Sequence, residues 1–187
     1  MVKVFLCKVM AILEVIKMGN PTLRKQSKPV GKELLTKEFQ CFLNDLVDTM
    51  RQYKGVGIAA SQVNVLKRVF AMEVNENSRY PDKNNIPLCV VINPEIEFQG
   101  HELVDSWEGC LSIPGIRGKL KRHQRILLKG LNIQGVAFEK ELEGFPAIIA
   151  QHELDHLNGK LLVDRMDSMK TLSFQKEYEE YWAKPKQ

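Results

Sequence analysis

The chain has 187 residues, of which 44% are hydrophobic and 27% are charged, as in an ordinary globular domain. This length allows one domain whose core needs neither disulfides nor a second chain, and the composition excludes the disordered, collagen-like and membrane-spanning classes. The net charge of +4 is spread along the chain, which favours a solvated surface over a site for nucleic acid or a membrane.

The first residues, MVKVFLCKV, contain an apolar patch interrupted by Lys3 and Lys8, which is too short for a secretory signal. Met10 would serve equally well as a start. We therefore expect residues 1–9 to be an appendage and residues 10–187 to form a single domain. The four cysteines lie far apart in the sequence, so we expect reduced thiols and a cytosol-like compartment.

The first predicted elements are a helix and a series of strands. Apolar residues recur at intervals of three and four from Gly31 to Lys54, which predicts an amphipathic helix closed by Gly55. Residues 63–142 then contain short β-rich runs separated by Gly, Pro and Asn, which is typical of antiparallel sheet. The runs are VLKRVFAMEV, PLCVVINPEIEF, RILLKGL and GVAFEKEL. The polar insert at residues 75–85 predicts an exposed loop.

Two further helices are predicted in the C-terminal third. One runs from about Phe145 to Leu157, with Pro146 in its first turn and Gly159 just past its end. The other begins near Ser168 as N-cap and continues toward the C-terminus. Because helices and strands are segregated along the chain rather than alternating, the predicted fold class is α+β.

The most specific motif is HELDH, an HExxH at residues 152–156. Residues four apart share one face of a helix, so His152 and His156 can bind one metal ion while Glu153 directs its carboxylate toward the same site. The alternative is a chance match on an ordinary charged helix. Against it, the motif holds half of the four histidines of the chain.

A catalytic site with one open position needs a third protein ligand. Downstream candidates are Glu177, Glu179 and Glu180, on a helix whose acidic residues more plausibly face solvent. The upstream candidate is Cys110, which lies in EGCLS beside a glycine and two residues after Glu108. On its own residues, Cys110 is better explained as a buried inert thiol.

A third motif, GVGIAASQ at residues 55–62, contains paired glycines but lacks a following Lys-Ser or Lys-Thr and follows a helix. A phosphate loop is therefore disfavoured. Small residues also let backbone approach a ligand closely, and Gln62 is an uncharged hydrogen-bond donor.

In this order, GVGIAASQ, EGCLS and HELDH resemble the three signature motifs of peptide deformylases, metal-dependent enzymes that remove the formyl group from the N-terminal methionine of new polypeptides. MGNPTLR, VINPEI, SIPGIRG and DHLNGKLLVDR also look like this family, so the resemblance covers nearly the whole chain from Met10. It implies an α+β fold in which antiparallel sheets surround a central HExxH helix, and a metal held by Cys110, His152 and His156.

The resemblance also implies roles for other residues. Glu153 would be the general base and acid, and the Gln62 side-chain amide and the Leu111 backbone N–H would stabilise the developing oxyanion. Val56, Gly57, Ile58 and Gly109 resemble positions that pair with the peptide main chain, and Arg117 would meet the peptide further along. For the apolar residues among them, simple core packing is the alternative.

The implied substrate and metal site lead us to expect two further sets of residues, one that binds the methionine side chain and one that orients the metal ligands. An apolar pocket for the methionine thioether would be lined by residues of the metal-bearing helix, namely Phe145, Ile148 and Ile149. Groups that orient the metal ligands would come from Glu108, Arg122 and Asp155, since a cation between two carboxylates would hold the Cys110 segment against that helix. For Arg122 alone, a solvated strand charge is the alternative.

The sequence leaves the metal open, because thiolate and imidazole suit Zn²⁺, Fe²⁺, Co²⁺ and Ni²⁺ alike; the family implies Fe²⁺. The expected partners are N-formyl-methionyl nascent peptides, and weak basic charge is all that supports docking to the ribosome. No specific nucleic-acid site and no membrane association are expected. The expected location is the bacterial-type cytoplasm, with an organelle matrix as the alternative.

Two other functions remain in competition. One is a zinc peptidase that takes Glu177, Glu179 or Glu180 as third ligand. The other is a catalytically silent module that only binds nascent peptides. The presence of Glu153 and Gln62 argues against the silent module, because binding alone needs neither residue.

Overall fold

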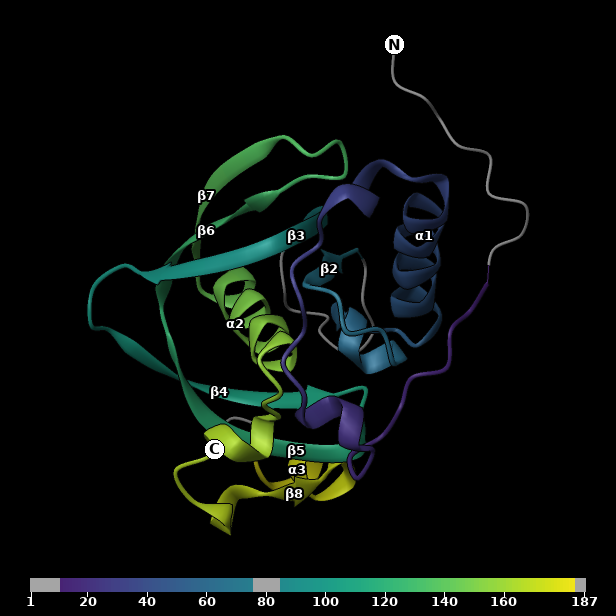
Figure 1. The fold of residues 1–187 in the computed structure, drawn as a ribbon. Coiled ribbons are helices and arrows are strands. Elements are labelled where there is room, and N and C mark those ends of the chain that lie inside the picture. Colours follow the sequence, from purple (N-terminus) through teal and green to yellow (C-terminus); the bar gives the residue numbers. More distant parts are fainter. Residues whose placement is uncertain (1–10, 76–84, 184–187) are drawn as a thin grey trace.

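The computed structural model describes residues 11–75 and 85–183. The proposed appendage, residues 1–9, and most of the polar insert at 75–85 lie outside the described residues. The fold is α+β, as predicted, with antiparallel sheets around a central helix (Figure 1).

The described residues form two antiparallel sheets. The five-stranded sheet has the order β1-β2-β3-β6-β7, and the three-stranded sheet has the order β4-β5-β8. The strands of the first sheet are β1 Gly57–Ala59, β2 Val69–Val74, β3 Ile86–Phe98, β6 Arg125–Leu131 and β7 Ala137–Glu143. Those of the second are β4 Leu103–Cys110, β5 Ile113–His123 and β8 Ser173–Phe174. Strands β1 and β4 are therefore both edge strands.

The predicted first helix is divided into two parts. A 3₁₀ turn, Lys32–Leu35, precedes helix α1, Lys37–Gln52. Thr36 separates them because its backbone is extended and its side chain accepts a hydrogen bond from the Phe39 N–H at 3.3 Å, an N-cap that starts a new helix.

The second predicted helix is confirmed as α2, Phe145–Leu157, with Pro146 in its first turn. The third begins later than predicted. Ser168 caps only a 3₁₀ turn, Met169–Thr171, and helix α3 spans Gln175–Tyr181. The residues between them form β8, whose pairing with β5 fixes an extended backbone there.

Helices α1 and α2 pack on opposite faces of the five-stranded sheet (Figure 1). Alternate residues of β2 point to opposite faces, so that Val69 and Ala71 join the core beneath α1, whereas Phe70 and Met72 join the core beneath α2. Both faces of β2 are thus covered, which explains its nearly unbroken apolar sequence.

The hairpin β4–β5 covers the other side of α2 (Figure 1). The β-rich runs in the sequence do not include these two strands. The reason is that polar and charged side chains occupy buried positions where a hydrophobic pattern would require apolar residues. These buried residues are Ser106, Glu108, Arg117 and Arg122. Enclosed by the hairpin and the sheet, α2 is buried on most of its circumference.

Among the described cysteines, Cys89 and Cys110 are free thiols. Cys41 is disulfide-bonded, so the expectation of a reduced thiol at this position is wrong. Cys7 lies outside the described residues.

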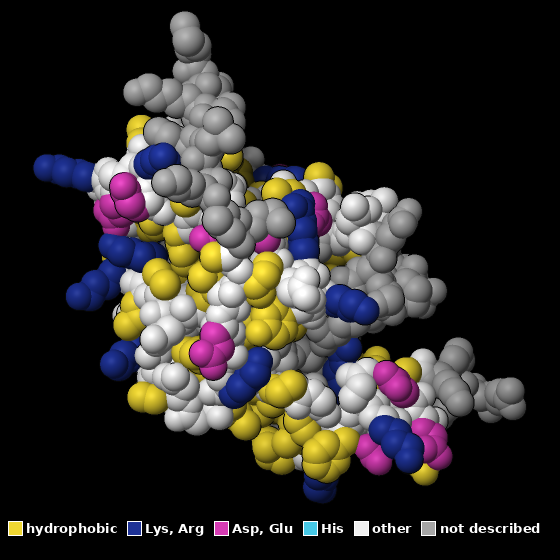
Figure 2. Space-filling view, turned by 90° about the vertical axis from the view of Figure 1, so that its right-hand side faces the viewer, with side chains coloured by type: hydrophobic (Ala, Val, Ile, Leu, Met, Phe, Trp, Pro, Cys, Tyr) yellow, Lys and Arg dark blue, Asp and Glu magenta, His cyan; other side chains and the backbone are white. Residues whose placement is uncertain are grey.

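On the face that carries α1, the described Lys and Arg side chains are scattered among hydrophobic and acidic ones rather than gathered into one patch (Figure 2). None of the helices formed by the described residues combines the length and apolarity needed to cross a bilayer.

Candidate metal centre and active site

Cys110, His152 and His156 come together where the end of β4 meets α2. The two imidazole rings lie one helical turn apart with centroids separated by 4.9 Å. Cys110 Sγ lies 3.1 Å from His156 Nε2, and the ligand atoms of the three residues lie within 4.8 Å of one another. The structure therefore brings together three groups of the kind that bind Zn²⁺ or Fe²⁺.

The hydrogen bonding of His152 leaves one ring nitrogen for a metal. Its Nδ1 lies 2.8 Å from Glu108 Oε2. An ionised carboxylate can only accept, so we assign the proton to Nδ1 and the lone pair to Nε2. His156 and Cys110 are 1% and 4% exposed, so both of these side chains are buried.

The electrostatics of these residues fit a bound cation. Burial by itself raises the pKa of the Cys110 thiol, but the two neighbouring imidazoles outweigh it and hold that pKa well below its ordinary value. Burial lowers the pKa of His152, but Cys110 and Glu108 reverse this and raise it well above its ordinary value. The site thus favours a thiolate with positive charge beside it, which a metal ion would also supply.

A buried ionic network supports His152 from behind. Arg122 donates from Nε to Glu108 Oε1 at 2.8 Å and from Nη2 to Glu108 Oε2 at 2.9 Å. Its Nη1 donates to Asp155 Oδ2 at 2.6 Å, and Arg165 pairs with the same carboxylate. Despite burial, which acts in the opposite direction, Arg122 and His152 lower the pKa of Glu108 to about 2. The network joins β4, β5 and α2 around one metal ligand.

Glu153 is 3% exposed and its carboxylate borders a cavity. Its Oε2 has no hydrogen-bond partner among the described residues. Burial is the main cause that raises the pKa of Glu153 to about 7. A carboxyl group with this pKa can both take and return a proton near neutral pH.

Gln62 is held in one orientation beside Cys110. Its Oε1 accepts a hydrogen bond from the Ala59 N–H at 2.8 Å, which fixes the side-chain amide. The Nε2 group therefore points to the other side, where it lies 3.6 Å from Cys110 Sγ and 3.3 Å from Ser112 Oγ. The resulting N–H donor is aimed at the metal centre.

The segment before η1 (Pro21–Arg24) ties the Gln62 turn to the Cys110 turn. The Ile16 N–H donates to the Gln62 carbonyl at 2.9 Å, and the Met18 N–H donates to the Ser112 carbonyl at 2.8 Å. Lys17 Nζ donates to the Leu111 carbonyl at 3.0 Å. The contacts of Lys17 and Met18 hold the two peptide groups that follow the Leu111 N–H.

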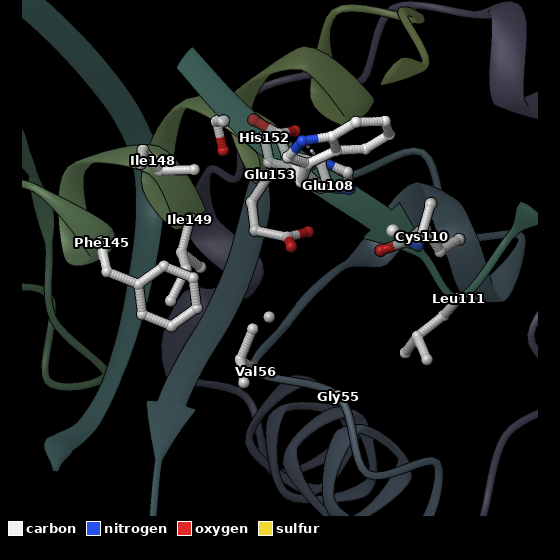
Figure 3. Close-up of a pocket in the computed structure, with 15 residues that line it drawn as sticks. Gly55, Val56, Glu108, Cys110, Leu111, Phe145, Ile148, Ile149, His152 and Glu153 are labelled. Carbon is white, nitrogen blue, oxygen red and sulfur yellow. Dashed lines mark hydrogen bonds and ion pairs between the residues drawn. The ribbon is translucent and has the colours of Figure 1, made fainter. Parts of the chain in front are cut away.

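A cavity opens between the two edge strands and α2 (Figure 3). Figure 3 shows Phe145, Ile148 and Ile149 on one side of it and Cys110 and Leu111 on the other, with the Glu153 carboxylate between them. The residues that line it are Gly55, Val56, Gly57, Gln62, Ser106, Trp107, Glu108, Gly109, Cys110, Leu111, Phe145, Ile148, Ile149, His152 and Glu153.

Two residues expected to contact the substrate do not line this cavity. Ile58 is fully buried in the core beneath α1. Arg117 is 3% exposed, and its Nε donates to Gln175 Oε1 at 2.8 Å. Their roles in substrate binding stay predictions. Arg122, Asp155 and His156 are buried and are not among the residues that line this cavity.

Sequence reasoning missed several neighbours of the site. Trp107 and Ser106 line the cavity, and the Ser112 N–H lies 3.4 Å from Cys110 Sγ. Ser106 and Trp107 directly precede EGCLS and Ser112 is its last residue, so the motif could have indicated all three. Arg165 gave no such signal, because its partner Asp155 lies ten residues earlier and only the fold brings them together.

The acidic residues of α3 are not part of the metal centre. Glu177, Glu179 and Glu180 are exposed. Within residues 11–75 and 85–183, Cys110, His152 and His156 form the one cluster of three side chains able to hold an ion. This disfavours the zinc peptidase.

Comparison with known sequences agrees with the resemblance seen in the three motifs. The family model described as polypeptide deformylase matches residues 12–172. A peptide deformylase of Leptospira biflexa is 40% identical over 167 residues, which cover 88% of this chain and 93% of the relative. Peptide deformylase 1 of Prochlorococcus marinus is 43% identical over 174 residues, covering 91% of this chain and 88% of the relative.

Solved structures show the same likeness. The Met-Ala-Ser-bound class I type b peptide deformylase of Acinetobacter baumannii superposes with a TM-score of 0.81 at 41% identity, covering 84% of this chain and 100% of that chain. A peptide deformylase of Thermotoga maritima has a TM-score of 0.74 at 37% identity, covering 84% of this chain and 99% of that one.

Proposed function

The chain belongs to the polypeptide deformylase family, and from this premise we propose how its residues carry out the family's reaction. The protein is a hydrolase that removes the formyl group from the N-terminal formyl-methionine of newly made polypeptides and releases formate. The observation that carries the assignment of residues is the Cys110, His152 and His156 cluster at the cavity that also contains Glu153.

Cys110, His152 and His156 would hold one divalent metal ion. Three ligands leave the open position that a catalytic site requires. When bound, such an ion supplies a water of lowered pKa and polarises the carbonyl to be attacked. The ligand chemistry suits several metals, and the ion proposed from the family is Fe²⁺, with Zn²⁺, Ni²⁺ and Co²⁺ as alternatives.

Glu153 would act as general base and then as general acid. Its carboxylate takes a proton from the attacking water and later gives it to the nitrogen of the leaving amine. A pKa of about 7 matches this double task, because neither protonation state is strongly preferred near neutral pH.

Gln62 and Leu111 would stabilise the negative charge that develops on the formyl oxygen. The Gln62 Nε2 is aimed by the hydrogen bond between its Oε1 and Ala59. The Leu111 N–H is fixed by the contacts of Lys17 and Met18 with the following peptide groups. Preorganised donors of this kind are worth about 3 to 4 kcal/mol each.

The peptide would lie between two sheet edges. Val56 and Gly57 flank or belong to β1, and Gly109 belongs to β4; both strands are outermost in their sheets. An extended peptide can add to such an edge through main-chain hydrogen bonds, whatever its side chains. The methionine side chain would enter the apolar part of the cavity, at Phe145, Ile148 and Ile149.

The substrate is made on ribosomes, so we place the reaction in the cytoplasm and include transient contact with the ribosome in the proposal. An unoxidised Cys110 is a chemical requirement of this site, because the thiolate is the metal ligand.

The decisive experiment uses protein prepared anaerobically, with metal analysis and an assay of formate released from formyl-Met-Ala-Ser. Wild-type protein is expected to contain about one metal ion per chain and to release formate. Cys110→Ala should lose metal and activity together, whereas Glu153→Ala should retain metal and lose activity. Full activity and metal content in Cys110→Ala would refute the assignment, and metal-loaded wild type that releases no formate would identify a silent binding module.

A further inference from the structure

The two faces of strand β4 contact different parts of the fold. Ser106, Glu108 and Cys110 are buried and belong to the face that meets α2 and the metal centre. Trp107 and Gly109 alternate with them and point to the opposite face. On that face, Gly109 lies opposite Arg117 and Trp107 lies opposite Lys119 in the register with β5.

The C-terminal segment, defined here as Ser173–Trp182, covers this second face. Its strand β8 pairs with β5 at Ile116 and Arg117, and α3 follows directly, so that the segment lies against β5 (Figure 1). The C-terminal segment is thus held by the hairpin that carries Cys110.

Trp107 connects the C-terminal segment to the cavity. Its ring centroid lies 5.0 Å from that of Tyr178 and 5.3 Å from that of Trp182, distances at which tilted aromatic rings attract one another. Trp107 is also one of the residues that line the cavity. The position of one cavity wall therefore depends on two rings of the C-terminal segment.

Arg117 makes a second connection. Its Nε donates to Gln175 Oε1 at 2.8 Å, and its guanidinium carbon lies 5.6 Å from the centre of the Tyr178 ring. The same guanidinium packs against the Gly109 backbone, since a Cβ atom at Gly109 would lie 2.9 Å from Arg117 Nη1. Arg117 is thus clamped between the C-terminal segment and the glycine that precedes Cys110.

We propose that the C-terminal segment is a positioning element for the substrate cavity, acting through Trp107 and Arg117 on the strand edge that receives the formylated peptide. The proposal rests on the function proposed above, because it concerns the same cavity. It assigns Tyr178 and Trp182 as positioning residues that set the affinity for peptide.

Loss of an aromatic ring of the C-terminal segment should weaken peptide binding more than it slows the chemical step. Glu108 and Cys110 are held from the other face by Arg122 and the histidines, so loss of an aromatic ring behind Trp107 leaves that network in place. The wall formed by Trp107 and Gly109 would lose its support. KM should therefore rise while kcat changes little.

The first test compares Tyr178→Ala and Trp182→Ala with Tyr181→Ala. Tyr181 is the last residue of α3 and is 65% exposed, so its substitution removes an aromatic side chain of the same segment. Each of the first two is expected to raise KM for formyl-Met-Ala-Ser between about twofold and tenfold, the factor that one aromatic pair is worth. Their kcat should stay within about twofold, and Tyr181→Ala should match wild type in both parameters.

The second test needs no turnover. Trp107 and Trp182 are the two tryptophans of the chain, so Trp182→Phe leaves Trp107 as the sole tryptophan fluorophore and keeps an aromatic ring behind it. Titration of this metal-loaded variant with Met-Ala-Ser is expected to change Trp107 emission saturably. Adding Tyr178→Ala should weaken this binding by the same factor as the rise in KM and should lower the fluorescence anisotropy of Trp107.

Thermal unfolding of every variant identifies those that do not fold, and Trp182→Ala, at a ring that is 48% exposed, provides a folded variant if Tyr178→Ala does not. The proposal is overturned if folded variants at 178 and 182 keep wild-type KM and peptide affinity, or if Tyr181→Ala raises KM equally. A wild type that releases no formate would refute the proposed function instead, and the binding titration would still read out this inference.

Discussion

The backbone of Gly57 and the carboxylate of Glu153 are so close that a Cβ atom on residue 57 would lie 2.3 Å from Glu153 Oε1 and 2.8 Å from its Cδ. Gly55 has a similar relationship with the second wall of the cavity, because its Cβ would lie 2.9 Å from Leu111 Cδ1. The paired glycines of GVGIAASQ are therefore explained by close approach of β1 and the residues just before it to two catalytic candidates.

Gly57→Ala should displace the Glu153 carboxylate from its position beside the metal ligands. Misplacement of a reacting group by about 1 Å can cost about a hundredfold in rate, so we expect kcat for formyl-Met-Ala-Ser to fall by about that factor. Metal content should be unchanged, since Gly57 touches no proposed ligand. Steady-state formate release and metal analysis measure both quantities.

The matched control is Gly130→Ala, in which the new Cβ would lie 2.7 Å from Val91 Cγ1. This clash lies in the five-stranded sheet and away from the cavity. It should lower the melting temperature and leave kcat of the folded protein unchanged. Equal kcat values for Gly57→Ala and Gly130→Ala would contradict the explanation.

A second prediction concerns pH and stability in metal-free protein. Burial raises the pKa of Glu153 to about 7 from 4.5, so the folded state binds this proton more tightly than the unfolded chain does. Between these values the stability falls as pH rises. Glu153→Gln removes this loss, and its free energy of unfolding should exceed that of wild type by about 3 kcal/mol at pH 8.

Urea unfolding of chelator-treated proteins at pH 4.5 and pH 8 measures this effect. The advantage of Glu153→Gln should be small at the lower pH and should grow toward pH 7. Glu141→Gln, at an exposed position of β7, is the control and should track wild type at both pH values. A constant difference across the range would show that proton uptake by Glu153 is not its cause.

Arg122→Met is expected to be strongly destabilising, because it leaves Glu108 and Asp155 buried without their shared cation. Removing one partner of a buried ion pair costs about 3 to 5 kcal/mol, measured by urea unfolding. Glu108 would also hold His152 less firmly, so metal affinity should fall by about tenfold to a hundredfold. Arg165→Met is the comparison: its side chain is 41% exposed, and a loss as large as that of Arg122→Met would contradict the assignment.

The elements that could be predicted from the sequence are those whose ends are marked by nearby residues. Helix α2 has its predicted limits because Pro146 and Gly159 mark its ends locally. The helix predicted near Ser168 begins later, because pairing of Ser173 and Phe174 with β5 overrides the local cap. The disulfide state of Cys41 had no signal in the spacing of the cysteines.

In the site, too, local spacing was predictable from the sequence and contacts between distant segments were not. The spacing of HELDH places two ligands on one helix face, which local geometry dictates. The third ligand came only with the family resemblance, since nothing near Cys110 distinguishes it from an inert thiol. The packing of Trp107 against Tyr178 and Trp182 joins segments about 70 residues apart, and local periodicity carries no information on such contacts.

Gln62→Leu should remove the proposed donor to the formyl oxygen and leave the metal ligands in place. Loss of one such donor costs about a hundredfold to a thousandfold in kcat, with little change in KM. Stability should also fall by about 1 to 3 kcal/mol, because the buried Ala59 N–H loses its acceptor. Ser61→Ala separates the two effects: it removes a buried hydrogen bond to the His156 carbonyl, so it should lower stability and keep kcat. If both variants lose stability and neither loses kcat, Gln62 supports the fold but not the transition state.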